Sequence, residues 1–373
     1  MSSSVARLSR LRHSETISYF LAFAGFALLI ILHEAGHFAA AKAVGMRVER
    51  FALFFPPLLF KVRRGETEYG IGAIPLGGYV RITGMNPNEE IAPEVESRAY
   101  YRQPVWKRVV VISAGPAMNV LVAFLILWGL FVIKGQAETT QAVAKAGLRP
   151  PAAGALRPGD EIVSIDGRRG GPEEIRKATA AHKCAGRQTN GCPATTPATV
   201  VVRRNGQLRT FRLIPRYDAA AKRMRIGFAF DTTYNDVGPV QAASLSVSGM
   251  WRVTKGTVSA LARIFQPEQR KQISGVVGTS DALQQTIKFD VAQAFVVLAI
   301  ISLSLAIVNL FPFLPLDGGH IFWALAEKVR GRPIPFSVME RASVVGFLLV
   351  MLLFFVGLSN DIDRLRGEGF GVR

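Results

Sequence analysis

Cysteine and histidine are scarce in this sequence, which holds only two cysteines and five histidines among 373 residues. The cysteines, Cys184 and Cys192, lie in a loop that contains glycine and proline, and two ligands at this spacing cannot form a zinc site without partners. Two free thiols and a disulfide both fit this loop, because pairing depends on a geometry that sequence does not fix. A disulfide would require an oxidising compartment.

Acidic residues are also few, at 27 against 45 Lys and Arg, and the formal net charge is +18. The basic residues are spread among loops and the flanks of apolar segments, without a recognition motif or a single basic face. We therefore expect no nucleic-acid partner. Membrane topology and contact with anionic lipid headgroups explain the charge. The sequence also lacks internal repeats and long, polar, repetitive stretches.

Apolar residues, by contrast, make up 49% of the chain, and the mean hydropathy of +0.25 is typical of a membrane protein. Four segments are long and apolar enough to cross about 30 Å of hydrocarbon as helices, at residues 17–41, 109–133, 291–310 and 338–358. No small-residue cleavage site ends the first segment, so it is not predicted to be a signal peptide. We expect a polytopic α-helical membrane protein with four transmembrane helices.

The distribution of Lys and Arg predicts the orientation of these spans. The loop at residues 42–108 carries eleven of them, so we expect it to be cytoplasmic. The link between the third and fourth spans adds basic residues on the same side, namely Lys328, Arg330 and Arg332. The N-terminus (residues 1–16) and the tail (residues 359–373) are then extracytoplasmic, although three arginines near the N-terminus favour the opposite orientation.

The first span contains the run His33-Glu34-Ala35-Gly36-His37. On a helix, residues four apart lie on one face, so both imidazoles can reach one metal ion with Glu34 beside them. In zinc proteases such a glutamate accepts a proton from water that the metal activates and passes it to the leaving amine. An ionisable residue inside a span costs about 2.5–3.5 kcal/mol on insertion scales, which disfavours a chance cluster or a purely structural one. We predict a zinc-protease site.

A catalytic zinc ion needs a third protein ligand and an open fourth position. The third span runs into residues 311–320, where two prolines break the helix and Asp317 lies in a glycine-rich turn. Counted at about 1.5 Å per residue, His33 lies toward the cytoplasmic side, at a depth compatible with Asp317. We predict Asp317 as the third ligand. His320 is a second candidate, and Asp317 could instead only cap a helix after the proline break.

These motifs together resemble those of the site-2 protease family of intramembrane zinc metalloproteases, in its bacterial regulator-of-sigma-E branch. The similarity covers nearly the whole chain. It rests on HEAGH in the first span, GPAMN in the second, an extracytoplasmic PDZ insert, and NLFPFLPLDGG at the end of the third.

The resemblance implies roles for single residues and a location for the protein. His33, His37 and Asp317 would bind Zn²⁺, Glu34 would be the catalytic acid and base, and Asn309 would contact the substrate backbone. The location would be a bacterial cytoplasmic (inner) membrane, with HExxH toward the cytoplasmic side. Asn119 would help to shape the site, or would form a structural hydrogen bond between spans.

Within the cytoplasmic loop, residues 69–82 combine Ile and Val runs with a Pro-Leu-Gly-Gly turn and predict a β-hairpin. The apolar residues 51–60 are too few to span the membrane and would dip into its interface. In similar proteins this region is a membrane re-entrant β-loop. A free strand edge there could bind an extended substrate by strand addition, and our candidates are Gly70, Ile71 and Gly72. A plain cytoplasmic hairpin is the alternative.

Residues 138–215 predict one small α+β domain. Residues 156–167 resemble the signature of PDZ domains and precede a helix that begins at Pro172 and a hairpin with Asn205 and Gly206 as its turn. This extracytoplasmic domain would offer a groove for an extended chain end. Residues 216–290 predict an amphipathic helical linker, which lies on the outer membrane surface or packs as a buried partner helix.

The sequence therefore predicts a zinc-dependent intramembrane endopeptidase whose partners are a transmembrane protein substrate and the lipid bilayer. The resemblance implies regulated intramembrane proteolysis of an anti-sigma factor already cut by an upstream site-1 protease, or of a remnant signal peptide. Two alternatives stay open. A membrane-anchored zinc protease would digest soluble loops, whereas a PDZ scaffold or a metal transporter would use the histidines without hydrolysis.

Overall fold

The computed structural model describes residues 2–86, 89–145, 147–219, 221, 223–263, 266 and 291–366. The chain divides into two compact units. Unit 1 comprises Met1–Leu130 and Pro239–Arg373, and unit 2 comprises Phe131–Gly238.

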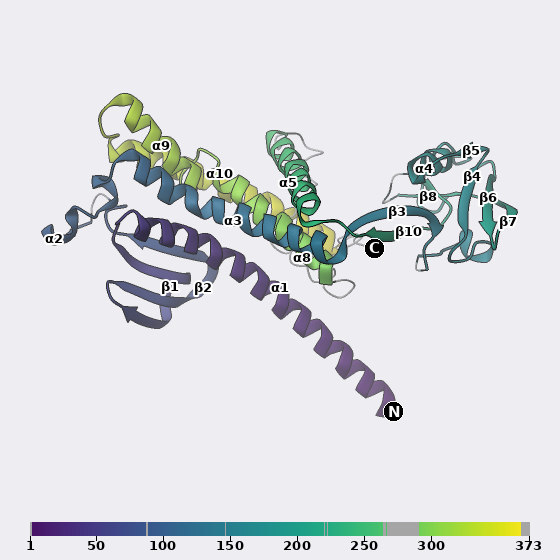
Figure 1. Cartoon of the computed structure of the whole chain (residues 1–373), viewed down its shortest axis with the longest axis horizontal. Coiled ribbons are helices and arrows are strands. Elements are labelled where there is room, and N and C mark those ends of the chain that lie inside the picture. The colour runs from purple at the N-terminus through teal and green to yellow at the C-terminus, as the bar shows by residue number, and fades with distance from the viewer. Residues whose placement is uncertain are drawn as a thin grey trace. The chain divides into compact units, whose positions relative to one another are not determined.

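Four helices of the chain are long and apolar enough to cross a membrane. They are α1 (Ser2–Ala43), α3 (Val105–Lys134), α8 (Val291–Asn309) and α10 (Phe336–Arg366) (Figure 1). Three of them contain a predicted span, and α8 ends one residue before the predicted limit at residue 310. Residues 2–16 and 359–366 were expected to lie outside the helices, but they continue α1 and α10. Neither stretch contains the glycine or proline that would end a helix, so helix formation propagates through both.

Two shorter helices, α5 (Pro239–Ala262) and α9 (Asp317–Arg330), also belong to unit 1. In α5, the buried residues Ala242, Ser246 and Met250 recur at helical spacing, and Met250 packs with Ala299 and Leu303 of α8. The predicted linker is therefore a partner helix over this part, while its residues 267–290 lie outside the described residues. The helix α9 ends at Gly331 in the left-handed conformation that favours glycine.

The loop between α1 and α3 folds into two long strands, β1 (Val48–Arg64) and β2 (Thr67–Ile82), which pair antiparallel. The chain reverses at Gly65, whose φ of 59° favours glycine. The two arms of the hairpin predicted at residues 69–82 do not pair with each other, because residues 50–53 of β1 lie between them. Residues 68–71 pair with residues 50–53 in the same chain direction, and residues 78–81 pair with them in the opposite direction. The chain therefore reverses between residues 72 and 77, where the Pro-Leu-Gly-Gly run predicts a turn. The short elements α2 (Pro93–Glu96) and η1 (Tyr100–Arg102) lead into α3.

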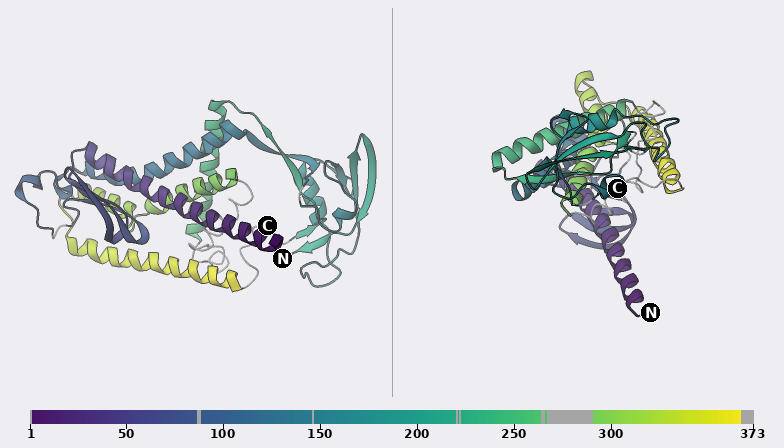
Figure 2. Two further views of the ribbon diagram at one scale, coloured as in Figure 1. Left: turned by 90° about the horizontal axis from the view of Figure 1, so that it is seen from below. Right: turned by 90° about the vertical axis from the view of Figure 1, so that its right-hand side faces the viewer.

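The β1–β2 sheet lies against the C-terminal half of α1 (Figure 1 and Figure 2). Phe38 of α1 makes edge contacts with the rings of Phe51 and Tyr69. Farther along β1, Leu59 and Phe60 are exposed. An exposed apolar strand end of this kind is typical of a surface that meets lipid or a partner.

Unit 2 is built around an antiparallel sheet with strand order β10-β3-β4-β6-β7, to which β5 adds by pairing with β4. The helix α4 (Pro172–Ala180) packs on its core through Ile175 and Ala178. The strands are β3 (Gln136–Val143), β4 (Glu161–Ile165), β5 (Arg168–Arg169), β6 (Ala198–Arg204), β7 (Gln207–Leu213) and β10 (Phe230–Asn235), with a separate pair of β8 (Arg216–Asp218) and β9 (Arg223–Arg225) and a turn of 3-10 helix, η2 (Ala152–Gly154).

The domain boundary in unit 2 differs from the predicted limit at residue 215. The strand β10 pairs with β3, and Ile226 belongs to the buried core of the unit, so residues 216–235 complete this domain and are not part of a linker. The other local predictions hold, because α4 begins at Pro172 and the turn between β6 and β7 lies at Asn205 and Gly206.

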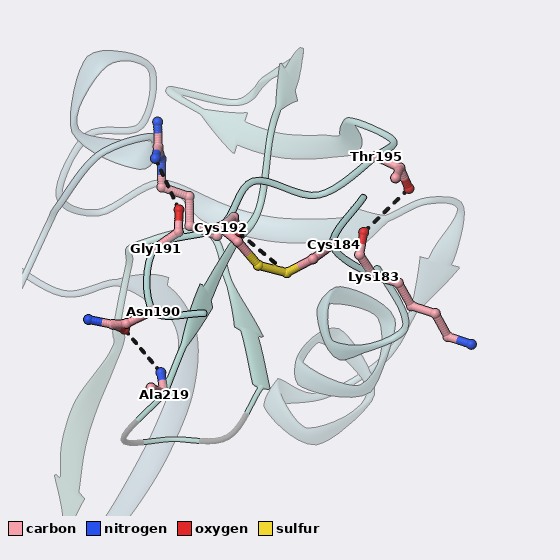
Figure 3. Close-up of a disulfide and its surroundings, with 8 residues drawn as sticks. Lys183, Cys184, Asn190, Gly191, Cys192, Thr195 and Ala219 are labelled. Carbon is pink, nitrogen blue, oxygen red and sulfur yellow. Dashed lines mark hydrogen bonds between the residues drawn. A yellow bond between two sulfur atoms is a disulfide. The ribbon is translucent and has the colours of Figure 1, made fainter. Parts of the chain in front are cut away.

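The loop after α4 is closed by a disulfide between Cys184 and Cys192 (Figure 3). Hydrogen bonds flank it on both sides, because the Thr195 hydroxyl donates to the Lys183 carbonyl and the Ala219 amide donates to the Asn190 side chain (Figure 3). The formation of this bond in the folded protein in solution stays a prediction.

Candidate metal centre

The two histidines of the HEAGH run lie one turn apart on α1 and point to the same place. Both are buried in the described structure, and their Nε2 atoms are 3.3 Å apart. Helix α1 places the ligand pair through its spacing alone, as the sequence predicts.

Asp317 joins the histidines as the first residue of α9. Its Oδ2 atom lies 3.2 Å from Nε2 of His33 and 3.4 Å from Nε2 of His37. The same Oδ2 atom is buried and accepts no hydrogen bond of normal geometry from the described residues. Three lone pairs therefore converge on one point in a buried environment, which normally requires a cation.

The three donor atoms fit a zinc ion. A tetrahedral ion about 2.0–2.1 Å from each donor separates the donors by about 3.3–3.4 Å, and the sides of this triangle are 3.2, 3.3 and 3.4 Å. Of the described residues, His33, His37 and Asp317 form the one group that could hold a metal ion. His320 lies one turn further along α9 and is not part of this group, and the helix cap at Leu316 uses no side chain of Asp317.

The helix α3 orients both histidines through their second ring nitrogens. Nδ1 of His37 donates to the Val111 carbonyl at 2.9 Å, which leaves Nε2 free to bind a metal. Nδ1 of His33 lies 3.1 Å from the Asn119 side-chain amide, which is fully buried and has an unpartnered Oδ1 among the described residues. If the Asn119 amide is turned by 180°, its oxygen and nitrogen exchange places, and Oδ1 accepts the proton of His33 Nδ1.

Two glycines make room for this packing of α1 on α3. A Cβ atom on Gly115 would lie 2.2 Å from Nε2 of His37, and one on Gly36 would lie 2.4 Å from the Ala114 carbonyl oxygen. Any larger residue at Gly115 would occupy the place of the ligand atom itself.

Glu34 faces the outer edge of the β1–β2 sheet. Its carboxylate accepts a hydrogen bond from the Val80 backbone, and a Cβ atom on Gly78 would lie 2.8 Å from its Cγ. The segment that sequence reasoning assigned to a turn thus lies beside the predicted acid and base.

Of the predicted substrate contacts, one lies at the metal centre and the other three lie within the β1–β2 sheet. Nδ2 of Asn309, at the end of α8, lies 3.5 Å from Nε2 of His33 and therefore at the centre. Gly70 and Ile71 instead lie inside the sheet and pair with β1 residues on both sides, and Gly72 pairs with Leu58.

Sequence reasoning did not assign Val111, Gly115, Gly78 or Val80 to the site. Val111 and Val80 act through backbone groups, which leave no mark on residue identity. The glycines carried a signal, because Gly115 lies in the GPAMN motif and Gly78 in the PLGG run, but only the structure shows what a side chain there would meet.

Comparison with known proteins shows the family. The model of peptidase family M50 matches residues 21–353. The zinc metalloprotease Rip1 of Mycobacterium tuberculosis is 34% identical over 383 residues, which cover 89% of this chain and 92% of that protein. Rip1 of Mycolicibacterium smegmatis is 32% identical, over 90% of this chain and 92% of that protein. The chain therefore belongs to peptidase family M50, the site-2 protease family of metalloendopeptidases.

Proposed function

We propose that this protein is a zinc-dependent intramembrane endopeptidase, which hydrolyses a peptide bond in or near the transmembrane segment of another membrane protein. The observation that carries the proposal is the triangle of His33, His37 and Asp317 with Glu34 beside it, on a helix apolar enough to span the membrane. A protease that digests soluble loops would have no need to bury this group in a span.

Each side chain has a defined task in this proposal. His33, His37 and Asp317 would hold the zinc ion, which when bound polarises the scissile carbonyl and activates water. Glu34 would accept a proton at its carboxylate and return it to the leaving amine. Asn309 would donate from Nδ2 to a substrate carbonyl beside the centre.

The outer edge of the sheet offers a place for the substrate backbone. A transmembrane helix must unwind before its peptide bonds can be cut, and lipid cannot replace the hydrogen bonds that it loses. Residues 78–82 pair with residues 48–53, and the Val80 backbone on their other side reaches Glu34. Strand addition along this edge would satisfy the unwound backbone next to the acid and base. This position replaces Gly70, Ile71 and Gly72, whose backbone groups already pair with β1.

The biological setting follows from family membership and charge distribution. The protein would lie in the bacterial inner membrane, with unit 2 as an extracytoplasmic PDZ domain and the metal centre toward the cytoplasm. Its substrates would be an anti-sigma factor first cut by a site-1 protease, or remnant signal peptides. Reporter fusions at Arg373 and near Gly170 test this topology, and an active cytoplasmic reporter at Gly170 would refute it.

The mechanism is tested by substitution of the acid and base. Purified Glu34→Gln should keep its zinc and fold but cleave a transmembrane substrate at least about 100-fold more slowly, because proton transfer is lost. Unchanged cleavage would remove Glu34 from the mechanism.

The ligand set is tested by metal content. Asp317→Ala should lose most of its zinc, whereas Asp363→Ala, at an exposed carboxylate far along α10, should keep it. Full zinc occupancy in Asp317→Ala would contradict this assignment and leave His320 as the candidate ligand.

A further inference from the structure

A partly buried ion pair joins the helix that orients the histidines to the helix that carries Asp317. Nη1 of Arg108 donates to Oε2 of Glu327 at 2.9 Å, and Nη2 donates to Oε1 at 2.7 Å. Such a two-bond contact between planar groups fixes orientation as well as distance. The Arg108 side chain is only 9% exposed, and its guanidinium lies 5.9 Å from the centre of the Tyr100 ring.

The two partners lie on the helices that carry residues of the metal centre. Arg108 lies one turn before Val111 and three turns before Asn119, the partners of His37 and His33. Glu327 lies ten residues after Asp317, about 15 Å along α9. Ile321, between them on α9, packs against a buried apolar cluster that includes Val111 and Ile112 of α3. The apolar contact brings the helices together but permits sliding, which the ion pair does not.

We infer that Arg108 and Glu327 form a positioning pair, which holds α9 in register with α3 so that Asp317 meets the two histidines at zinc-binding distance. This inference rests on the proposed role of Asp317 as a zinc ligand. Neither residue touches the metal or the substrate, so both would act through Asp317.

The Arg108 side chain is buried and the Glu327 side chain is 25% exposed, so the pair loses much of its hydration. This energetic cost favours a positioning role over a purely stabilising one. Desolvation of two charges offsets most of their attraction, and apolar replacements of the same volume are often as stable. For stability alone, the ion pair would therefore have little advantage over two apolar side chains. A metal ligand, in contrast, must be placed to within a few tenths of an ångström. Replacement of a group that orients a ligand typically lowers metal affinity 10- to 100-fold.

The test compares two lysine substitutions by equilibrium zinc affinity, measured against a chromophoric chelator. Arg108→Lys keeps the charge but removes the two-bond fork, and should weaken zinc binding about 10- to 100-fold. The matched control is Arg102→Lys, because Arg102 also binds a glutamate, Glu96, but at the surface, where the two side chains are 58% and 39% exposed. The control should bind zinc like the unaltered protein.

A second measurement separates positioning from simple loss of structure. The absorption spectrum of bound Co²⁺ reports ligand geometry, and it should change in Arg108→Lys while the melting temperature of the metal-free protein stays near that of the control. Unaltered zinc affinity and Co²⁺ spectrum would overturn the inference. An affinity loss that merely follows a lower melting temperature of the metal-free protein would overturn it too.

A double-mutant cycle identifies the residue through which the pair acts. In an Asp317→Asn background, Arg108→Lys should cost little further zinc affinity, because the ligand that it positions is already impaired. An equal loss in both backgrounds would contradict action through Asp317. Full zinc affinity in Asp317→Asn alone, by contrast, would contradict the proposed ligand set, so the two failures are distinguishable.

Discussion

Gly115 offers a direct test of how closely α3 packs against the metal ligands. In Gly115→Ala the new Cβ atom would lie 2.2 Å from Nε2 of His37, whereas a comfortable contact needs about 3.5 Å. The ring must therefore retreat by more than about 1 Å. Its other nitrogen is held by the Val111 carbonyl, so this retreat breaks either that hydrogen bond or the metal contact.

The expected size of the effect follows from the number of ligands. Complete zinc sites bind with about 10–16 kcal/mol, so a ligand contributes about 3 kcal/mol, and its loss lowers affinity about 100-fold. Gly115→Ala should therefore lose zinc on dialysis against a weak chelator and lose cleavage with it.

The matched control lies in the same helix. A Cβ atom on Gly129 would meet nothing within 4 Å, so Gly129→Ala should be neutral, or stabilising by about 0.5–1 kcal/mol. Metal content by mass spectrometry, zinc affinity and melting temperature of the metal-free protein decide the outcome. If Gly115→Ala binds zinc as tightly as Gly129→Ala, the placement of His37 against α3 is refuted.

Three further predictions concern the β1–β2 sheet, the turn that joins its two strands, and unit 2. Gly78→Ala should retain zinc but lose cleavage, because its Cβ would press on Glu34 at 2.8 Å; joint loss of zinc would contradict this division of roles. Hydrogen bonds from Arg98 and Lys42 lower the pKa of Glu66 to about 2. The stability advantage over Glu66→Gln should therefore be complete above about pH 4.5 and fade as the pH falls toward about 2, and a constant difference in melting temperature would refute it. Without reductant, alkylation of the intact protein should label neither Cys184 nor Cys192, and full labelling would exclude the disulfide.

Local patterns predicted the parts of this protein that depend on neighbouring residues in the chain. The membrane helices follow from apolar segment length, and His33 and His37 share a face because they are four residues apart. The predicted domain limit at residue 215 was wrong because it depends on residues far apart in the chain. The strand β10 pairs with β3, and this pairing is visible only in three dimensions. The PLGG run likewise predicted a turn, but the sequence did not show that residues 50–53 of β1 lie between the two arms that this turn joins.

The surroundings of the ligands could not be predicted because they are non-local. His37 meets a carbonyl 74 residues away, His33 meets an amide 86 residues away, and Arg108 meets Glu327 across 219 residues. Such distances follow from helix packing, for which hydropathy gives no register, since lipid-facing and protein-facing surfaces of a span are both apolar. Polar groups within a span are the exception, because each one must find a partner. The few polar residues at helix positions in and near the spans are therefore the best guides to how these helices meet, and here they lead from four different helices to one point.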